Sequence, residues 1–321
     1  MELTHDVITA RTADGVSLAI QHIAPVQGAS RGSVVLQHGL GANALTLNFP
    51  GRSLAAYLAA QGFDCYVPEL RGAGASDRPA RYGLDEYLEQ DIPAIIGAVQ
   101  RAGGQRELKW VGHSMGGIVL MLYGIEHHDV PVKRFVAIGS ALDYRPGKSV
   151  HRETRALRPL AGSWLSTLPF GALTRLNGLV AGKGPLLPAE KMNFWRHNIE
   201  PELMRRMLKT GFDSIPMGLL DDLNTTFDDA GLSRKQGTIA YLPRAHEFIV
   251  PTLLIGGSRD VQATPESITE TARLLSGVRN LEVARFGKPH GHVDDYGHVD
   301  LVVGRHVEVE TWPAISEFLS H

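Results

Sequence analysis

The sequence predicts an α/β protein in which helices cover both faces of a mostly parallel, doubly wound sheet and a helical cap is inserted into the chain. Two observations predict this fold class. Apolar strand-like runs alternate with helix-like segments over residues 1–144 and again over 247–321, whereas residues 145–246 contain no clean strand pattern. Strands without a polar face are typical of a parallel sheet that is buried on both sides. We therefore expect a core made of two chain parts.

The first core part is expected to begin with an antiparallel hairpin, because alternating runs flank a turn at Asp14 and Gly15. A short apolar strand follows, then a helix closed by Gly62 and a second strand. The next helix is long and should be kinked at Pro93. In chain order these elements are expected at 7–10, 17–22, 33–38, 54–61, 63–68, 85–101, 108–111 and 134–138.

Residues 145–246, called the cap segment below, mix Pro, Gly and Arg with amphipathic pieces such as 201–208. A stretch of this length is too long for a structureless loop within a compact domain. We therefore expect it to form helices that cover the core. The sheet then resumes, and its remaining elements are expected at 250–256, 265–275, 280–286 and 309–319.

The composition is that of an ordinary globular protein, since 43% of the 321 residues are hydrophobic and 21% are charged. A net charge of −2 indicates neither a nucleic-acid partner nor an anionic membrane surface. No apolar run is long enough to span a membrane, and the N-terminal residues do not resemble a signal peptide, so we expect a cytoplasmic protein without integral membrane association. The single cysteine, Cys65, excludes an intrachain disulfide and a cysteine-rich zinc site. The oligomeric state stays open.

The most informative motif is the run Gly112-His113-Ser114-Met115-Gly116, which joins an apolar strand to an apolar helix. A Gly-x-Ser-x-Gly pattern at such a junction is typical of a nucleophile elbow. The turn is so tight that only glycine fits at its two ends, and the serine is held in a strained conformation with its hydroxyl exposed. Ser114 is therefore the expected nucleophile.

A serine hydroxyl needs a base to take its proton and an acid to orient that base. In this architecture the acid and then the histidine follow the serine in the chain. Asp260 lies in the loop that follows the strand at 250–256, at the edge where parallel sheets bind ligands, and is the expected acid. His298 follows a glycine in the loop after the last strand and precedes a short apolar helical run, so it is the expected base.

Other residues compete for these two roles. Asp260 alternatively caps the following helix. Rival acids are Asp143, which also follows a strand, and Asp294 and Asp295, which come late for the chain order. Rival bases are His290 and His292 in the same loop as His298. This His-x-His pair also suggests a metal site, but without a third ligand we expect no metal and no cofactor.

Hydrolysis of a carbonyl compound also needs N–H donors for the negative charge that develops on the carbonyl oxygen. Met115 directly follows the nucleophile and begins a helix, so its N–H is the first expected donor. The second is the N–H of Leu40, in the loop His38-Gly39-Leu40-Gly41, because glycine lets the backbone after that strand turn toward the substrate.

These motifs resemble those of the α/β-hydrolase-fold serine hydrolases of the lipase and carboxylesterase kind. The similarity covers about two-thirds of the chain, namely both predicted parts of the sheet. It rests on residues 38–39, 71–76, 112–117, 257–260 and 297–300. Residues 297–319 are also similar to the end of polyhydroxyalkanoate synthases, but those carry cysteine as nucleophile, and Ser114 favours hydrolysis.

The resemblance assigns structural roles to several polar residues around the expected site. This chain has Glu69 where the family usually has Asp, and we expect a structural hydrogen bond there. His113 should point away from the substrate. Arg71 is expected to tie its loop to the sheet, and Asp300 to steady the loop of His298.

Charged and aromatic side chains of the cap segment have two possible interpretations. Its arginines are expected on a solvated face, with contact to an anionic substrate as the alternative. Its aromatic residues are expected in the core of the cap segment, with an acyl pocket as the alternative. The residues concerned are Arg152, Arg155, Arg158, Arg205 and Arg206, and Trp164, Phe170, Phe194 and Trp195.

The sequence thus predicts a serine esterase or lipase that hydrolyses small carboxylic esters with an apolar, short-to-medium acyl group. The same triad can cleave thioesters or carbon–carbon bonds of diketone-type substrates, and the sequence does not separate these reactions. A non-catalytic ligand-binding module of this fold is the third interpretation, although such proteins usually lack a triad residue.

Overall fold

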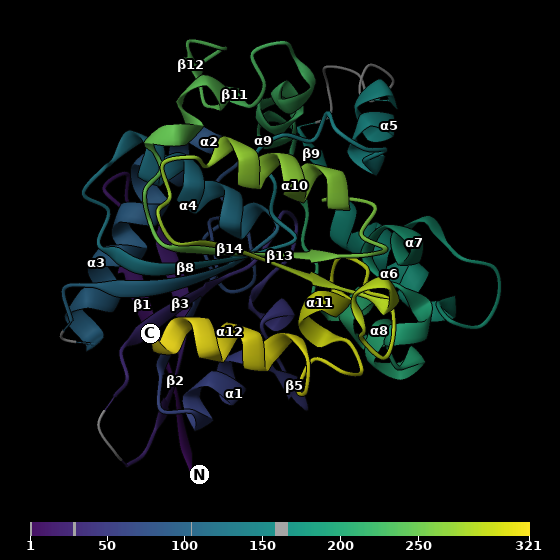
Figure 1. Ribbon diagram of the computed structural model, residues 1–321, viewed down its shortest axis with the longest axis horizontal. Helices are drawn as coiled ribbons and strands as arrows, with labels where there is room; N and C mark the ends of the chain where they lie inside the picture. The colour runs from purple at the N-terminus through teal and green to yellow at the C-terminus, as the bar shows by residue number, and fades with distance from the viewer. Residues whose placement is uncertain (1, 28–29, 104, 158–165) are drawn as a thin grey trace.

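Figure 1 shows the computed structural model, which describes residues 2–27, 30–103, 105–157 and 166–321. Its main sheet has eight described strands in the order β1-β2-β6-β3-β7-β8-β13-β14. β2 is antiparallel to β1 and to β6, and all further neighbours are parallel, which confirms the mostly parallel sheet. The strands are β1 (Leu3–Arg11), β2 (Ser17–Pro25), β3 (Ser33–Gln37), β6 (Asp64–Pro68), β7 (Leu108–His113), β8 (Val132–Ile138), β13 (Thr252–Gly257) and β14 (Leu281–Phe286).

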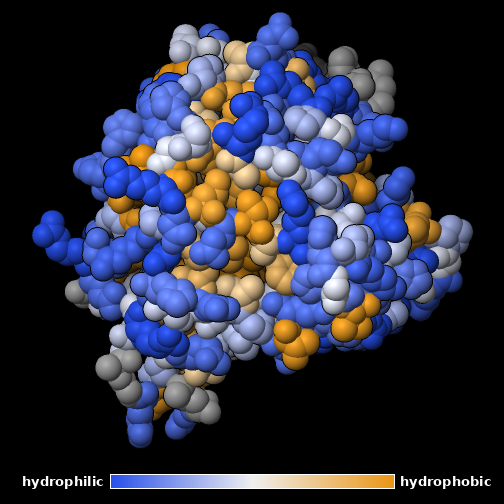
Figure 2. Space-filling model, in the orientation of Figure 1, coloured by the Kyte–Doolittle hydropathy of each residue, from blue (hydrophilic) through white to orange (hydrophobic). Residues whose placement is uncertain are grey.

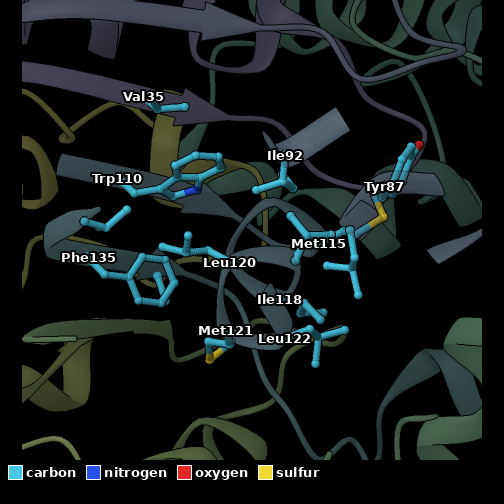
Figure 3. Close-up of a cluster of buried hydrophobic side chains, with 14 of the residues drawn as sticks. Val35, Tyr87, Ile92, Trp110, Met115, Ile118, Leu120, Met121, Leu122 and Phe135 are labelled. Atoms are coloured by element: carbon cyan, nitrogen blue, oxygen red, sulfur yellow. The ribbon is translucent and has the colours of Figure 1, made fainter. Parts of the chain in front are cut away.

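Helices cover both faces of the sheet because successive residues of the central strands enter opposite cores. Trp110 lies in the core on one face and Val111 in the core on the other, and both are fully buried. Figure 3 shows the first core, where side chains of α4 pack beside Trp110 and Phe135. The helices outside the cap segment are α1 (Leu54–Ala60), α2 (Leu84–Glu86), α3 (Ile92–Gly103), α4 (Met115–Glu126), α10 (Pro265–Leu274), α11 (Asp300–Val303) and α12 (Thr311–Ser320).

The helix expected at 85–101 is interrupted by a wide turn. A π-helical segment, Tyr87–Asp91, joins α2 to α3. Pro93 has no N–H to donate into the preceding turn, so the regular ladder of helical hydrogen bonds is broken just where the wide turn ends. This turn carries Asp91, which binds Arg71.

Arg71 ties its loop to the sheet and to this turn, as expected. Its guanidinium is 2% exposed and donates to the fully buried Asp91 carboxylate through Nε, at 2.8 Å, and to Asp14 through Nη1, at 2.7 Å. Burial raises the pKa of the Asp91 carboxyl to about 6, against the opposing effect of Arg71. This raised pKa stabilises the folded state fully at pH values below about 4, the ordinary pKa of an aspartate carboxyl. The stabilisation is lost as the pH rises through 6.

The variant Arg71→Met is expected to lower the free energy of unfolding by about 3–5 kcal/mol at pH 8, because it leaves the buried Asp91 carboxylate without its cation. Without Arg71 the pKa of Asp91 rises further, so the carboxyl takes up a proton as the pH falls. Urea unfolding should therefore show a smaller loss at pH 5 than at pH 8. Arg273→Met, which breaks a pair between the exposed Arg273 and Glu270, is the control and should leave the free energy of unfolding nearly unchanged. An equal loss for Arg71→Met at both pH values would contradict the expectation.

The cap segment folds mainly into helices, with α6 and α8 packed against each other. Their approach is close at Gly178, where a Cβ atom would lie 2.9 Å from Lys209 Cγ. The segment contains α5 (Val150–Leu157), α6 (Phe170–Val180), α7 (Pro188–Asn193), α8 (Pro201–Thr210) and α9 (Met217–Asn224).

Short strands that the sequence analysis did not predict also occur. Within the cap segment, β9 (Thr167–Leu168) pairs with β10 (Ile215–Pro216), and β11 (Ser233–Arg234) with β12 (Ile239–Ala240). In the core, β4 (Asn48–Phe49) pairs with β5 (Arg52–Ser53). The expectation of no strands at 145–246 was wrong in this detail, because two residues are too few to show the alternation that identifies a strand.

Two features of the molecule bear on contact with a membrane or with a partner strand. No helix in the described part of the chain is long and apolar enough to cross a bilayer. Figure 2 shows apolar side chains in the middle of one face, between α10 and α12, where the edge strand β14 lies and Val283 is 40% exposed. Glu282 and Arg285 on the same strand are also exposed, and charged residues of this kind protect an edge strand against pairing.

Candidate active site

Ser114 lies in the sharp turn between β7 and α4, with φ 54° and ψ −123°. This left-handed conformation is rare for a residue with a side chain and marks local strain. The Ser114 N–H donates to the Ile138 carbonyl on the neighbouring strand at 2.8 Å, which holds the turn in place. A Cβ on Gly112 would overlap the backbone of Gly117, and one on Gly116 would overlap that of Gln37. The turn therefore has the tight geometry expected of the motif.

Asp260 and His298 meet at the carboxyl ends of the strands. His298 Nδ1 lies 2.7 Å from Asp260 Oδ2, and both side chains are buried. The other carboxylate oxygen accepts the N–H groups of Gln262 and Ala263 at 2.8 and 3.0 Å. Helix α10 is capped by Thr264, not by Asp260, so the carboxylate is engaged with the histidine.

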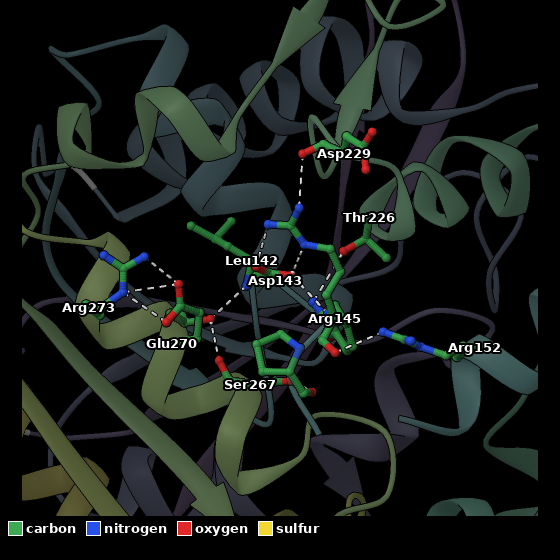
Figure 4. A network of polar contacts seen from close by, with 12 residues as sticks. Leu142, Asp143, Arg145, Arg152, Thr226, Asp229, Ser267, Glu270 and Arg273 are labelled. Carbon is green, nitrogen blue, oxygen red and sulfur yellow. Dashed lines mark hydrogen bonds and ion pairs between the residues drawn. The ribbon is translucent and has the colours of Figure 1, made fainter. Parts of the chain in front are cut away.

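The rival acid Asp143 is engaged elsewhere. Figure 4 shows it bound to Arg145, whose Nε and Nη2 lie 2.9 and 2.7 Å from the two carboxylate oxygens. Asp143 therefore serves the loop after β8 and does not contact His298.

The other rivals lie in the loop after β14, and the contacts seen for them are with groups other than Asp260 and His298. Asp295 accepts hydrogen bonds from Ser258 Oγ and the Lys288 N–H, and Asp294 lies 3.5 Å from the Lys288 ammonium group. His292 packs on the ring of Phe286 and His290 is exposed. The described residues contain no group of three metal-ligating side chains.

Two buried groups hold the backbone around His298. Asp300 accepts the N–H groups of Gly297 and Trp195 at 2.9 and 3.0 Å, and burial raises its pKa to about 7. His113 Nε2 lies 3.1 Å from the His298 carbonyl oxygen, which can only accept, so this nitrogen carries the proton. Burial lowers the pKa of His113 to about 3. His113 also lines the pocket described below, although the sequence analysis expected it to point away from the substrate.

The two expected N–H donors lie beside Ser114. Met115 is the first residue of α4, where N–H groups have no partner within the helix. Leu40 lies in a loop that passes so close to the nucleophile that a Cβ on Gly39 would be 2.9 Å from Ser114 Cβ. Buried His38 supports this loop, with Nδ1 2.9 Å from the Gly39 carbonyl and Nε2 accepting the Leu70 N–H at 3.2 Å.

The loop is also fixed from two sides. Asp213 of the cap segment donates its N–H to the Gly41 carbonyl at 2.7 Å and accepts a hydrogen bond from Asn43 Nδ2 at 3.1 Å. Glu69 accepts the N–H of Ala44 at 3.2 Å, which is the structural hydrogen bond expected of this residue. The position of Leu40 thus depends on the core and on the cap segment.

Ser114 and His298 line a common cavity of about 360 Å³, together with Leu40 and Met115. No hydrogen bond joins the Ser114 hydroxyl to the His298 ring in the described structure, and catalytic hydrogen bonds are often long before substrate binds. No Asp, Glu, Lys or Arg side chain is among the described residues that line the cavity. Most of the apolar wall comes from the cap segment, including Phe170, Phe212, Ile215, Met217, Leu223 and Phe227.

The cap aromatic residues divide between core and cavity. Phe194 is buried in a core cluster, as expected, whereas Phe170 lines the cavity and packs edge-on against Phe212. The sequence could not separate these roles, because apolar periodicity is the same for a helix that faces a core and one that faces a pocket. Arg259 lies over the ring of Trp195, and Trp164 lies outside the described residues.

The described cap arginines contact protein groups and do not line the cavity. Arg152 and Arg155 lie over the ring of Phe227, Arg205 pairs with Glu202, and Arg206 lies over the ring of Phe49. Arg158 lies outside the described residues.

Comparison with known proteins places this chain in a family. Residues 32–304, most of the chain, match the sequence model of the family described as alpha/beta hydrolase fold. The chain belongs to this family. Human lipase member M is 34% identical to this α/β hydrolase over 339 aligned residues, which cover 91% of this chain and 77% of that protein. Lipase member K of Mus musculus is 34% identical over 135 residues, which cover 37% of this chain, so the match spans about a third (33%) of that lipase.

Solved structures show the same fold at lower identity. The monoacylglycerol lipase of Paleococcus ferrophilus has a TM-score of 0.62 and 21% identity, covering 100% of this chain and 99% of its own. The enol-lactonase of Burkholderia xenovorans LB400 has a TM-score of 0.65 and 16% identity, covering 98% and 100%. The predicted resemblance to α/β hydrolases of the lipase and esterase kind is confirmed.

Sequence reasoning on this α/β hydrolase missed several polar residues of the cavity wall, among them Thr46, Asn224, Thr226 and three more. These three are His151 on α5, Asn193 at the end of α7 and Gln262 just after Asp260. Of the three, only Gln262 had a signal, its position two residues after the expected acid. The other two belong to the cap segment, where tertiary packing alone decides which side chains reach the cavity.

The variant Asp300→Asn is expected to lower kcat about tenfold with little change in KM. The amide oxygen can still accept the N–H of either Trp195 or Gly297. The amide NH2 group then faces the other N–H, and two donors cannot form a hydrogen bond. The loop that carries His298 is therefore held less firmly. Steady-state kinetics on a simple ester measures the effect. The control Asp294→Asn changes a carboxylate on the outer side of the same loop and should leave kcat unchanged, so an equal loss in both variants would contradict the assigned role.

Proposed function

We propose that this protein is a serine hydrolase of small carboxylic esters, with Ser114 as nucleophile, His298 as base and Asp260 as the orienting acid. The 2.7 Å contact between Asp260 and a histidine that shares a cavity with the strained Ser114 carries the proposal. The cap segment, 145–246, covers the cavity between core parts 1–144 and 247–321. The lipase relatives support this reaction class.

Each step uses a group that the cavity supplies. Ser114 Oγ attacks the ester carbonyl carbon while His298 takes its proton, and the N–H groups of Leu40 and Met115 stabilise the resulting oxyanion. The C–O bond to the alcohol then breaks, and His298 gives the proton to the leaving alkoxide. Water, which loses a proton to His298, attacks the acyl-enzyme. The acyl C–O bond then breaks, His298 returns the proton to Ser114 Oγ, and the carboxylic acid leaves. Asp260 keeps the His298 proton on Nδ1, so that Nε2 can act as the base.

The wall of the cavity favours an apolar acyl group of short-to-medium length. Burial of an apolar chain contributes roughly 25 cal/mol per Å², and no described charged side chain would have to be desolvated. The acyl preference follows from the cap segment, because most of the apolar wall belongs to it.

A series of p-nitrophenyl esters of increasing acyl length tests the function, with the matching thioesters alongside. We expect kcat/KM to rise with chain length, to pass through a maximum and to fall once the chain outgrows the cavity, with thioesters hydrolysed more slowly. If the folded protein hydrolyses no ester of the series, ester hydrolysis is wrong. Faster cleavage of the thioesters would instead favour a thioesterase.

A further inference from the structure

Helix α6 of the cap segment buries its small side chains and exposes its large apolar ones. Figure 1 shows it beside α7 and α8 at one side of the molecule. Its buried face consists of Gly171, Thr174 and Gly178, whereas a surface helix ordinarily turns its large apolar residues toward the core. Residues three and four positions apart share one helix face, so the exposed apolar residues form a stripe on the opposite face. This leucine stripe consists of Leu173, Leu176, Leu179 and Val180, which are 47%, 63%, 58% and 54% exposed.

The leucine stripe is a local feature of the surface. In the described part of the chain, exposed leucines occur only within residues 173–186, where Leu186 follows the stripe at 52% exposure. Other large apolar side chains that are exposed lie singly along the chain, as is normal for a protein surface. Several such side chains on one helix face instead mark a contact surface, because water is displaced from all of them at once.

The exposed charged side chains of this part of the cap segment are cations. Arg175 adjoins the stripe on α6, Lys183 lies in the turn after the helix, and Lys191 lies on α7. Between residues 166 and 199 the single acidic residue is Glu190, which is 1% exposed and lies 2.9 Å from the Arg196 guanidinium. The net charge of the whole chain, −2, therefore hides a local excess of positive charge.

A leucine stripe flanked by cations matches a lipid surface with anionic headgroups. A helix of this kind lies in the plane of such a surface, with its apolar side chains in the outer acyl region and its Lys and Arg side chains at the headgroup phosphates. A second copy of this chain is a poorer match. A symmetric dimer through the same face would bring the positive side chains of Arg175 and Lys183 close to those of the other copy.

We propose that the leucine stripe of α6 docks this protein onto the surface of an anionic lipid membrane, with Arg175 and Lys183 at the lipid phosphates. The contact is peripheral, because only the outward face of one helix enters the lipid. Helix α6 begins at Phe170, which lines the cavity, so the docked face lies next to the wall of the candidate active site. The proposal goes beyond ester hydrolysis and does not depend on it, since binding to lipid needs no turnover.

Flotation with lipid vesicles tests the docking on the full chain. We expect the wild type to bind phosphatidylglycerol vesicles at least about tenfold more tightly than phosphatidylcholine vesicles, and to be released from them by high salt. Ser114→Ala should bind equally well, because the candidate nucleophile takes no part. Absence of binding to phosphatidylglycerol vesicles, or equal binding to both lipids, would overturn the proposal. Hydrolysis of a soluble p-nitrophenyl ester in the same buffer reports on the proposed function separately.

Two double variants assign the binding to the stripe. Leu176→Gln combined with Leu179→Gln keeps the charge and the helix propensity, and should weaken binding to phosphatidylglycerol vesicles about tenfold or more. Its kcat/KM on a soluble ester should stay within about twofold of wild type, since both side chains lie on the surface. The control, Val7→Gln combined with Val309→Gln, removes two apolar side chains that are 69% and 73% exposed elsewhere, and should bind like the wild type.

Two results with these variants would contradict the lipid contact. The first is a stripe variant that binds vesicles as tightly as the wild type. The second is a wild-type dimer in analytical ultracentrifugation that the stripe variant converts to a monomer, because the stripe would then be covered by a second copy of the chain.

Discussion

Replacing Ser114 by alanine is expected to lower kcat/KM for ester hydrolysis by about 10⁴-fold or more, because no other hydroxyl takes its place. The backbone of the turn is fixed by the Gly112 and Gly116 packing and by the hydrogen bond to Ile138, so the variant should fold like the wild type. Rates on the preferred p-nitrophenyl ester, together with urea unfolding of both proteins, separate lost chemistry from lost structure.

Ser258→Ala is the matched control for this substitution. Ser258 precedes the loop of Asp260 and donates to Asp295 at 2.7 Å, outside the cavity. Its replacement should change kcat/KM by less than about threefold. If the Ser114→Ala protein kept more than a hundredth of wild-type activity, Ser114 would not be the nucleophile.

Replacing Asp260 by asparagine is the second large expected effect, a fall in kcat of about 10³- to 10⁴-fold. One carboxylate oxygen accepts two backbone N–H groups and the other accepts from His298 Nδ1. An asparagine keeps the backbone contacts with its oxygen and turns its NH2 group toward Nδ1. The ring then carries its proton on Nε2, where it cannot accept the proton of Ser114.

The rival acid provides the comparison for this variant. Asp143→Asn weakens the contacts to Arg145 and should cost less than about tenfold in kcat. Comparable losses in Asp143→Asn and Asp260→Asn, or a fully active Asp260→Asn protein, would contradict the assignment of Asp260.

The sheet could be predicted because each buried strand shows its own pattern in the local sequence. Buried parallel strands are continuous apolar runs, so the strands now seen as β3, β6, β7, β8 and β13 were visible in the sequence. The π-helical segment before Pro93 could not be predicted. The proline indicates that one helical hydrogen bond is missing, but it does not indicate that the preceding turn widens. The two-residue strands have no periodicity to detect.

In the candidate site, too, the positions of some residues could be predicted from the sequence and those of others could not. The position of Ser114 was predictable because glycine must flank a tight strand-to-helix turn. The contact between Asp260 and His298 was predictable because strand ends converge at one edge of a parallel sheet. The positions of Phe170 and His151 in the cavity wall were not predictable. They depend on how the cap segment packs on the core, and no local pattern records that packing.

The most direct test of the proposed mechanism is covalent labelling with a p-nitrophenyl alkylphosphonate, followed by intact mass measurement and peptide mapping. We expect one phosphonyl group on Ser114 of the wild type, none on Ser114→Ala, and much slower labelling of His298→Gln, which has lost the base. A folded wild-type protein that takes up no label, or that carries it on another residue, would contradict a serine nucleophile activated by His298.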